Sequence, residues 1–166
     1  DVEPAFLEEW MQAEQARELV GMLTVSLLAD TLTIYFAELE KEIGIAFVNP
    51  KERKALFKLG KVAAYRQILE AVTGEAFATC PVRFDLIEQV ILARNDIAHS
   101  DDFVSFNARH NHNTLEKHPN PFFIVGDNLA EPGSLAWNAL KIEVSREKLM
   151  AAVDEVEKLA DWVQQN

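Results

Sequence analysis

The chain has 166 residues, a formal net charge of -11 and hydrophobic residues at 49% of its positions. This length and composition predict one globular domain that covers residues 1–166 and has a single core. The acidic excess excludes a protein that binds nucleic acid through bulk positive charge, so any contact with phosphate must come from a local cluster of cations.

The beginning of the chain carries no targeting signal that we recognise. Asp1–Pro4 lacks the basic residues and the apolar run of a signal peptide. The most apolar region, residues 19–36, contains Asp30 and several hydroxyl side chains, so we expect it to fall short of the about 20 mainly apolar residues of a membrane span. The one cysteine, Cys80, fits a reducing compartment. These features predict a cytoplasmic protein with no membrane partner.

Two helices are predicted in the first half of the chain. Apolar residues at helical spacing predict a helix from Pro4 to about Ile43, or two helices with a break at Gly21. A second helix is predicted from Asn49 or Pro50 to about Thr73. Its polar face is basic and is either a solvated surface or a phosphate-facing cluster; its cations are Lys51, Arg53, Lys54, Lys58, Lys61 and Arg66.

The second half of the chain is predicted to contain two more helices around an insertion. The helices run from Val82 to about His99 and, capped by Ser145, from Arg146 to about Gln164. Residues 103–121 lack a helical period and predict a long loop, whereas residues 122–125 and 140–144 resemble two strands of a hairpin. We therefore predict an all-α fold, an up-and-down bundle of four to five helices, with a loop or small β-hairpin inserted at about residues 101–144.

Arg94, near the end of the third predicted helix, interrupts its apolar pattern. It lies four residues after Val90 and three after Ile91, where an apolar residue is expected. A buried unpaired guanidinium is costly. We therefore expect Arg94 either to pair with an internal carboxylate or to open onto a cavity at the helix end.

His99 lies five residues after Arg94, which is roughly 140° around the axis of a continuous helix. Arg94 and His99 therefore do not share a helix face, whereas Asn95 and His99 do. A site that uses both Arg94 and His99 needs a helix end, a kink or a second copy of the chain.

These residue types suit phosphate chemistry. Histidine titrates near neutrality and can act as a general acid or base, and the arginine fork matches phosphate oxygens. Asn95 could orient either partner, and Asp96 could tune the histidine. The alternative is purely structural: Arg94 forms a salt bridge within the bundle, and His99 caps the carboxyl end of its helix.

The pattern Arg94-Asn95-x-x-x-His99 resembles the R-x4-6-H motif of the HEPN (higher eukaryotes and prokaryotes nucleotide-binding) domain family, in which a polar residue, often Asn, commonly follows the Arg. The family is an all-α bundle with this motif near the end of a core helix. The specific part of the resemblance is six residues long.

The resemblance implies a metal-independent endoribonuclease that needs no cofactor. Two protomers would share one cleft, the ribose 2′-hydroxyl would attack the adjacent phosphate, and a cyclic phosphate would remain. His99 would be the general acid/base, Arg94 would stabilise phosphate charge, and Asn95 would orient the site. Such proteins commonly act as toxins beside a cognate antitoxin, or in defence. Other members keep the fold without cleavage, which leaves a nucleotide-binding or protein-interaction module as the alternative.

A second group of polar residues lies in the predicted loop. Arg109, His110 and His112 stand close together, and His118 follows. No cysteine is near, and the spacing matches no standard zinc pattern, so we predict no metal site. Together with Asp96, the residues Arg109, His110 and His112 are candidates for contact with the RNA substrate; a plain exposed loop is the alternative.

Overall fold

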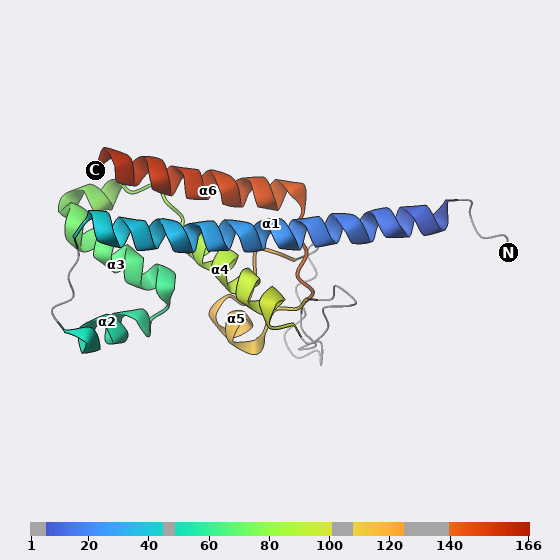
Figure 1. The fold of residues 1–166 in the computed structure, drawn as a ribbon, viewed down its shortest axis with the longest axis horizontal. Helices are drawn as coiled ribbons and strands as arrows, with labels where there is room; N and C mark the ends of the chain where they lie inside the picture. Colours follow the sequence, from blue (N-terminus) through green and yellow to red (C-terminus); the bar gives the residue numbers. More distant parts are fainter. Residues whose placement is uncertain (1–5, 45–48, 101–107, 125–139) are drawn as a thin grey trace.

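The structure is a computed structural model that describes residues 6–44, 49–100, 108–124 and 140–166 (Figure 1). It confirms the all-α fold class. The described part of the chain contains six α-helices rather than four to five, and a 3-10 helix, η1, at Gly74–Thr79. The α-helices are α1 (Leu7–Glu42), α2 (Pro50–Phe57), α3 (Lys61–Thr73), α4 (Phe84–Ala98), α5 (His112–Lys117) and α6 (Arg146–Gln165).

The long helix α1 is the axis of the fold (Figure 1). Helix α6 lies alongside it and runs in the same direction, and α4 packs against both. The core between these helices contains fully buried side chains from each of them; examples are Leu32 and Phe36 of α1, Ile87 and Val90 of α4, and Leu159 of α6. The amino-terminal part of α1 projects beyond the bundle, and its first buried residue is Gly21.

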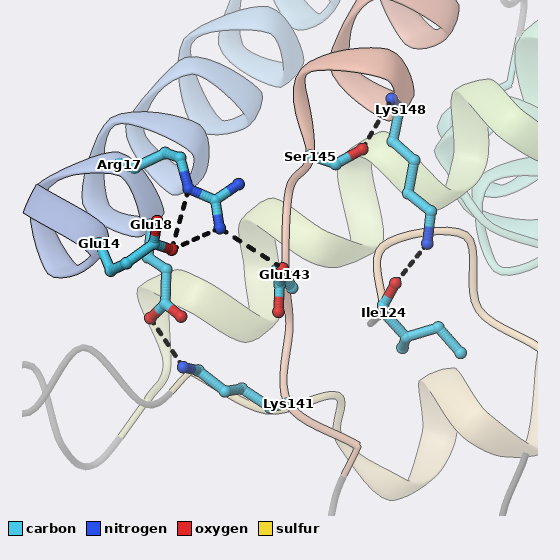
Figure 2. Close-up of polar contacts among 8 residues, drawn as sticks. All are labelled: Glu14, Arg17, Glu18, Ile124, Lys141, Glu143, Ser145 and Lys148. Carbon is cyan, nitrogen blue, oxygen red and sulfur yellow. Dashed lines mark hydrogen bonds and ion pairs between the residues drawn. The ribbon is translucent and has the colours of Figure 1, made fainter. Parts of the chain in front are cut away.

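Helix α1 runs through Gly21 without a break. A Cβ atom at Gly21 would lie 2.8 Å from the carbonyl oxygen and 2.9 Å from the Cβ of Val144. The segment that leads into α6 crosses α1 at this point, and its Lys141 Nζ lies 2.7 Å from Glu18 Oε2 of α1 (Figure 2). Glycine is therefore present because the backbone of residues 140–145 passes directly against the helix.

We expect the Gly21→Ala substitution to lower the free energy of unfolding by about 1–3 kcal/mol, the usual cost of overpacking. Alanine is the better helix former by about 1 kcal/mol, but the clash is with backbone, which has no rotamer by which to move away. Urea denaturation measures the effect, with the exposed Gln15→Ala of the same helix as the control. A Gly21→Ala protein that is more stable than wild type would contradict this close approach.

The prediction of one continuous helix from Asn49 or Pro50 to about Thr73 is wrong. Gly60 divides this stretch into the two helices α2 and α3. Gly60 has φ +108, in the left-handed region that favours glycine. Helix α2 is held to α1 by Arg53, whose Nε and Nη2 each lie 3.1 Å from a carboxylate oxygen of Glu40. Tyr65 of α3 donates to the same carboxylate at 2.9 Å and stacks on Phe36. This network joins the three helices.

Burial, reinforced by the hydrogen bond to Glu40, raises the pKa of Tyr65 to about 12. The folded chain therefore keeps the phenol proton above pH 10, where an unfolded tyrosine loses it. We expect a stability contribution that is complete below about pH 10 and is lost as the pH rises toward 12. Ultraviolet titration of the phenolate, with urea midpoints at pH 9 and 11.5, measures it. The Tyr65→Phe variant should lose less stability over this range; an equal loss would contradict the assignment.

The predicted loop contains a helix, which the sequence pattern missed. Helix α5 is a single short element whose amino end is capped by Asn111, which accepts a hydrogen bond from the Thr114 backbone at 2.9 Å. The strand-like segment 140–144 forms backbone hydrogen bonds with the residues before α5. Ile142 N donates to Ala108 O, and His110 N donates to Leu140 O. One bond, Glu143 N to Phe123 O, joins it to the described part of the other predicted strand. The hairpin is thus not confirmed, and Val125 lies outside the described residues.

The apolar region of α1 was expected to fall short of a membrane span, and this expectation is wrong by length and hydropathy. Helix α1 contains an 18-residue window with a mean hydropathy of 1.7, which is long and apolar enough to cross a membrane. Core helices of soluble proteins meet the same criterion. One third of this window, 33%, is buried within the described structure.

Candidate functional site

The buried face of α4 differs from the predicted stripe. Ile87, Val90, Ala93 and Asp96 point into the core. Arg94 lies at the edge of this face, and its side chain is 38% exposed. The prediction that Arg94 replaces a core residue is therefore wrong, because the stripe turns toward Asp96 rather than continuing through Ala98, which is exposed. The buried polar residue of the helix end is Asp96.

Arg94 pairs with a carboxylate at the surface rather than with an internal one, and it also opens onto a groove. Its Nε lies 3.2 Å from Oδ1 of Asp30 on α1, and the carboxylate is itself 56% exposed. Arg94 and Asn95 also line a groove of about 350 Å³ between α1, α4 and the ends of α3 and α5. The polar groups of this groove come from all four helices; besides Arg94 and Asn95 they are Asp30, Thr33, Lys61, Glu88 and Lys117.

The groove carries more positive than negative charge. Arg94 pairs with Asp30, and Lys117 pairs with Glu88. The third cation, Lys61, faces the hydroxyl of Thr33 at 3.3 Å and no carboxylate that lines the groove. Within an acidic chain, the groove is thus a local cluster of three cations and two carboxylates. The sequence placed Lys61 on a basic face, but it gave no signal that Asp30 and Lys117 would join it.

We expect the Arg94→Leu substitution to change the free energy of unfolding by less than about 1 kcal/mol, because an ion pair with both partners exposed contributes little. Leucine also retains the aliphatic contacts of the arginine stem. Thermal and urea denaturation measure the change, with Asp30→Asn as the companion variant that removes the other partner. A loss of several kcal/mol would show that the guanidinium supports the fold and would favour the purely structural interpretation.

His99 lies outside the groove, as the helical angle predicts. It is the exposed C-cap residue that follows the last residue of α4, and its backbone N–H donates to Asn95 O at 3.0 Å. Helix α4 is continuous up to this point, so no kink turns the imidazole toward Arg94. The groove lining includes Arg94 and Asn95 but not His99. One copy of the chain does not assemble Arg94 and His99 into one site.

Asp96 and His110 have a different placement from the one predicted. Both residues are 3% exposed. Asp96 Oδ2 lies 3.2 Å from His110 Nδ1, the amide of Asn111 donates to Asp96 Oδ1, and His110 Nε2 lies 3.2 Å from Phe123 O. The buried side chains of Asp96 and His110 have no surface to offer RNA, whereas Asn111, at the edge of the network, is exposed. The network fastens the segment 108–124 to α4.

Two further contacts of α4 continue this attachment. Glu88 Oε2 lies 3.1 Å from His118 Nε2, and Gln89 accepts a hydrogen bond from the Phe122 backbone at 2.6 Å. The segment that contains α5 is therefore fixed to α4 by polar side chains between Glu88 and Asp96. The insertion is a structural part of the domain in its described portion.

The other two candidate substrate residues are at the surface. Arg109 is exposed, and its backbone forms the antiparallel bridge with Lys141. His112 begins α5, and its Nε2 lies 3.0 Å from Glu116 Oε1. Neither residue lines the groove. The described ranges contain no group of three or more His, Cys, Asp or Glu side chains arranged to hold a metal ion.

The comparisons with known proteins do not place the chain in a family. The sequence matches no protein-family model, and neither the curated proteins nor the solved structures give a match. The likeness to HEPN domains thus rests on Arg94, Asn95 and His99 and on the all-α fold.

Proposed function

We propose that the chain is a metal-independent endoribonuclease of HEPN type that works as a homodimer in the cytoplasm. Its role would be that of a toxin, held by a cognate antitoxin, or of a defence protein. The observation that carries the proposal is the groove, where Arg94 and Asn95 line an opening that also contains Lys61 and Lys117. This cluster supplies the local positive charge that an RNA phosphate needs on an otherwise acidic chain.

The chemistry divides between the groove and the end of α4. Arg94 would bind the scissile phosphate by its guanidinium fork, and Asn95 would hold it in position. His99 would take the proton of the ribose 2′-hydroxyl, whose oxygen attacks phosphorus, and a second His99 would give a proton to the departing 5′-oxygen. The products are a 2′,3′-cyclic phosphate and a free 5′-hydroxyl. Because Arg94 and His99 face different sides of α4, the second copy would complete the site.

The test is incubation of the purified chain with a synthetic single-stranded RNA in the presence of EDTA. We expect cleavage, with cyclic phosphate ends identified by mass spectrometry. An RNA of the same sequence with 2′-deoxyribose throughout should stay intact, because it lacks the attacking oxygen. Equal cleavage of the RNA and of its 2′-deoxyribose counterpart, or cleavage only after a divalent metal is added, would overturn the proposal.

A non-catalytic HEPN-fold module that binds a nucleotide is the second candidate. It is favoured by the pairing within the groove, where Arg94 and Lys117 are already neutralised by Asp30 and Glu88. A small phosphate ligand would then bind mainly to Lys61, without being cut. Stabilisation of the chain against heat by a nucleoside monophosphate, without any cleavage of RNA, would support this candidate over the ribonuclease.

A further inference from the structure

An apolar face of α1 is left uncovered by the rest of the described chain. Val20, Leu23, Leu27 and Ile34 are exposed by 60%, 54%, 67% and 64%. They are separate from the buried residues of the same helix, which include Val25, Leu32 and Phe36. Helix α1 is therefore apolar on two sides, and only one of them packs against α4 and α6.

The exposed apolar residues follow a seven-residue repeat. Val20, Leu27 and Ile34 are spaced by seven, and Leu23 lies three residues after Val20. The exposed small residues Ala13, Ala16 and Ala37 extend the repeat over four heptads, with Asp30 as its one charged member. We call this set the α1 stripe. Such a pattern is the seam by which one helix packs against another of the same kind.

We propose that the α1 stripe is the surface by which two copies of this chain associate, with their α1 helices antiparallel. The seam matches itself, so a second α1 supplies the partner that the repeat requires. A parallel pair in register would place the two Asp30 carboxylates in one layer, where they repel. An antiparallel pair with its axis beside Leu27 separates them by about six residues, or about 9 Å along the helix.

Charges at the two ends of the stripe favour the same orientation. Arg17 and Glu38 lie ten and eleven residues on either side of Leu27, and their side chains are 54% and 58% exposed. In the antiparallel arrangement, Arg17 of one copy approaches Glu38 of the other. The projecting amino-terminal part of α1 then lies against the carboxyl-terminal part of the second α1, which ends at Glu42.

The size of the surface places the expected dimer among the small, weak interfaces. From Ala13 to Ala37 the stripe is about 36 Å long and about 10 Å wide, roughly half of the about 800 Å² per partner in a standard interface. We therefore expect a dimer whose dissociation is visible between about 1 and 100 µM protein.

The stripe also borders the groove, since Asp30 belongs to both. The antiparallel pair brings the two Asp30–Arg94 pairs close to the axis. This link to a composite site rests on the proposed ribonuclease, whereas the interface itself does not.

Sedimentation equilibrium over this concentration range tests the interface. The wild-type mass should approach twice the 18.7 kDa of the monomer. Leu27→Lys should stay monomeric at all concentrations with an unchanged circular dichroism spectrum, because the side chain is exposed in the monomer. Val72→Lys, which alters an exposed apolar residue of α3 outside the stripe, is the control and should associate like wild type. Equal association of both variants would overturn the proposal that the α1 stripe is the interface.

The orientation and the rival occupant have their own tests. Glu38→Lys should weaken the dimer, and Arg17→Glu combined with Glu38→Lys should restore it; no restoration would overturn the antiparallel arrangement. Flotation with phosphatidylcholine vesicles by a chain that stays monomeric would assign the stripe to a lipid surface and overturn the dimer. RNA cleavage is scored separately: cleavage by a monomeric Leu27→Lys variant would contradict the composite site and leave the interface intact.

Discussion

Replacing His99 by Ala is expected to abolish RNA cleavage in EDTA while the fold remains intact. A general acid or base contributes about 10²–10⁴-fold to a rate, and a composite site would lose both of its copies at once. The stability should not change by more than about 0.5 kcal/mol, because His99 is an exposed residue at the end of α4. Its side chain makes no hydrogen bond or ion pair with another residue of the described ranges.

The measurement is the initial rate on a labelled RNA, with urea denaturation of the same preparation. Gln164→Ala, an exposed change in the last turn of α6, is the control for handling and should cleave like wild type. Cleavage by His99→Ala at the wild-type rate would show that His99 has no part in the proposed mechanism. A variant that loses activity together with several kcal/mol of stability would instead place His99 among the residues that hold the fold.

The second large effect is expected at Asp96, and it is an effect on stability. Removing its carboxylate with Asp96→Ala would leave the buried His110 without its partner and would break the hydrogen bond from the Asn111 amide. Leaving a buried hydrogen-bonding group without its partner costs about 1–3 kcal/mol, and more where the partner that is lost is charged. We also expect the amides of residues 108–118 to exchange faster with solvent, since Asp96 fastens this segment to α4.

Asp85→Ala is the matched control, because Asp85 lies on the same helix but is 58% exposed in its side chain. We expect that variant to lose less than about 1 kcal/mol, the usual value of an acid in the first turn. Asp96→Asn keeps the shape and should fall between the two, which provides a readout if Asp96→Ala does not fold. Equal urea midpoints for the Asp96 and Asp85 variants would contradict the structural role of the network.

The candidate site was partly visible in the sequence. The spacing from Arg94 to His99 fixes their angle on a helix, and the structure keeps them on different sides of α4. The roles of Asp96 and His110 were not visible, because a carboxylate and an imidazole fourteen residues apart carry no sign that they meet inside the protein. The sequence did not reveal the exposed stripe of α1 for a related reason. Both apolar faces of α1 have helical spacing, and only the packing of α4 and α6 shows which face is covered.

The sequence by itself determined the all-α class, the extents of α1, α4 and α6, and the angular separation of Arg94 and His99. These follow from local rules, namely apolar spacing, the Ser145 cap and the 3.6-residue turn. The tertiary structure alone decided that Gly60 breaks a helix, that residues 140–144 pair with the segment before α5, and that Asp30 and Lys117 join Arg94 in a groove. Those outcomes depend on contacts between segments far apart in the chain, where a backbone or side chain finds its partner only after the helices have packed.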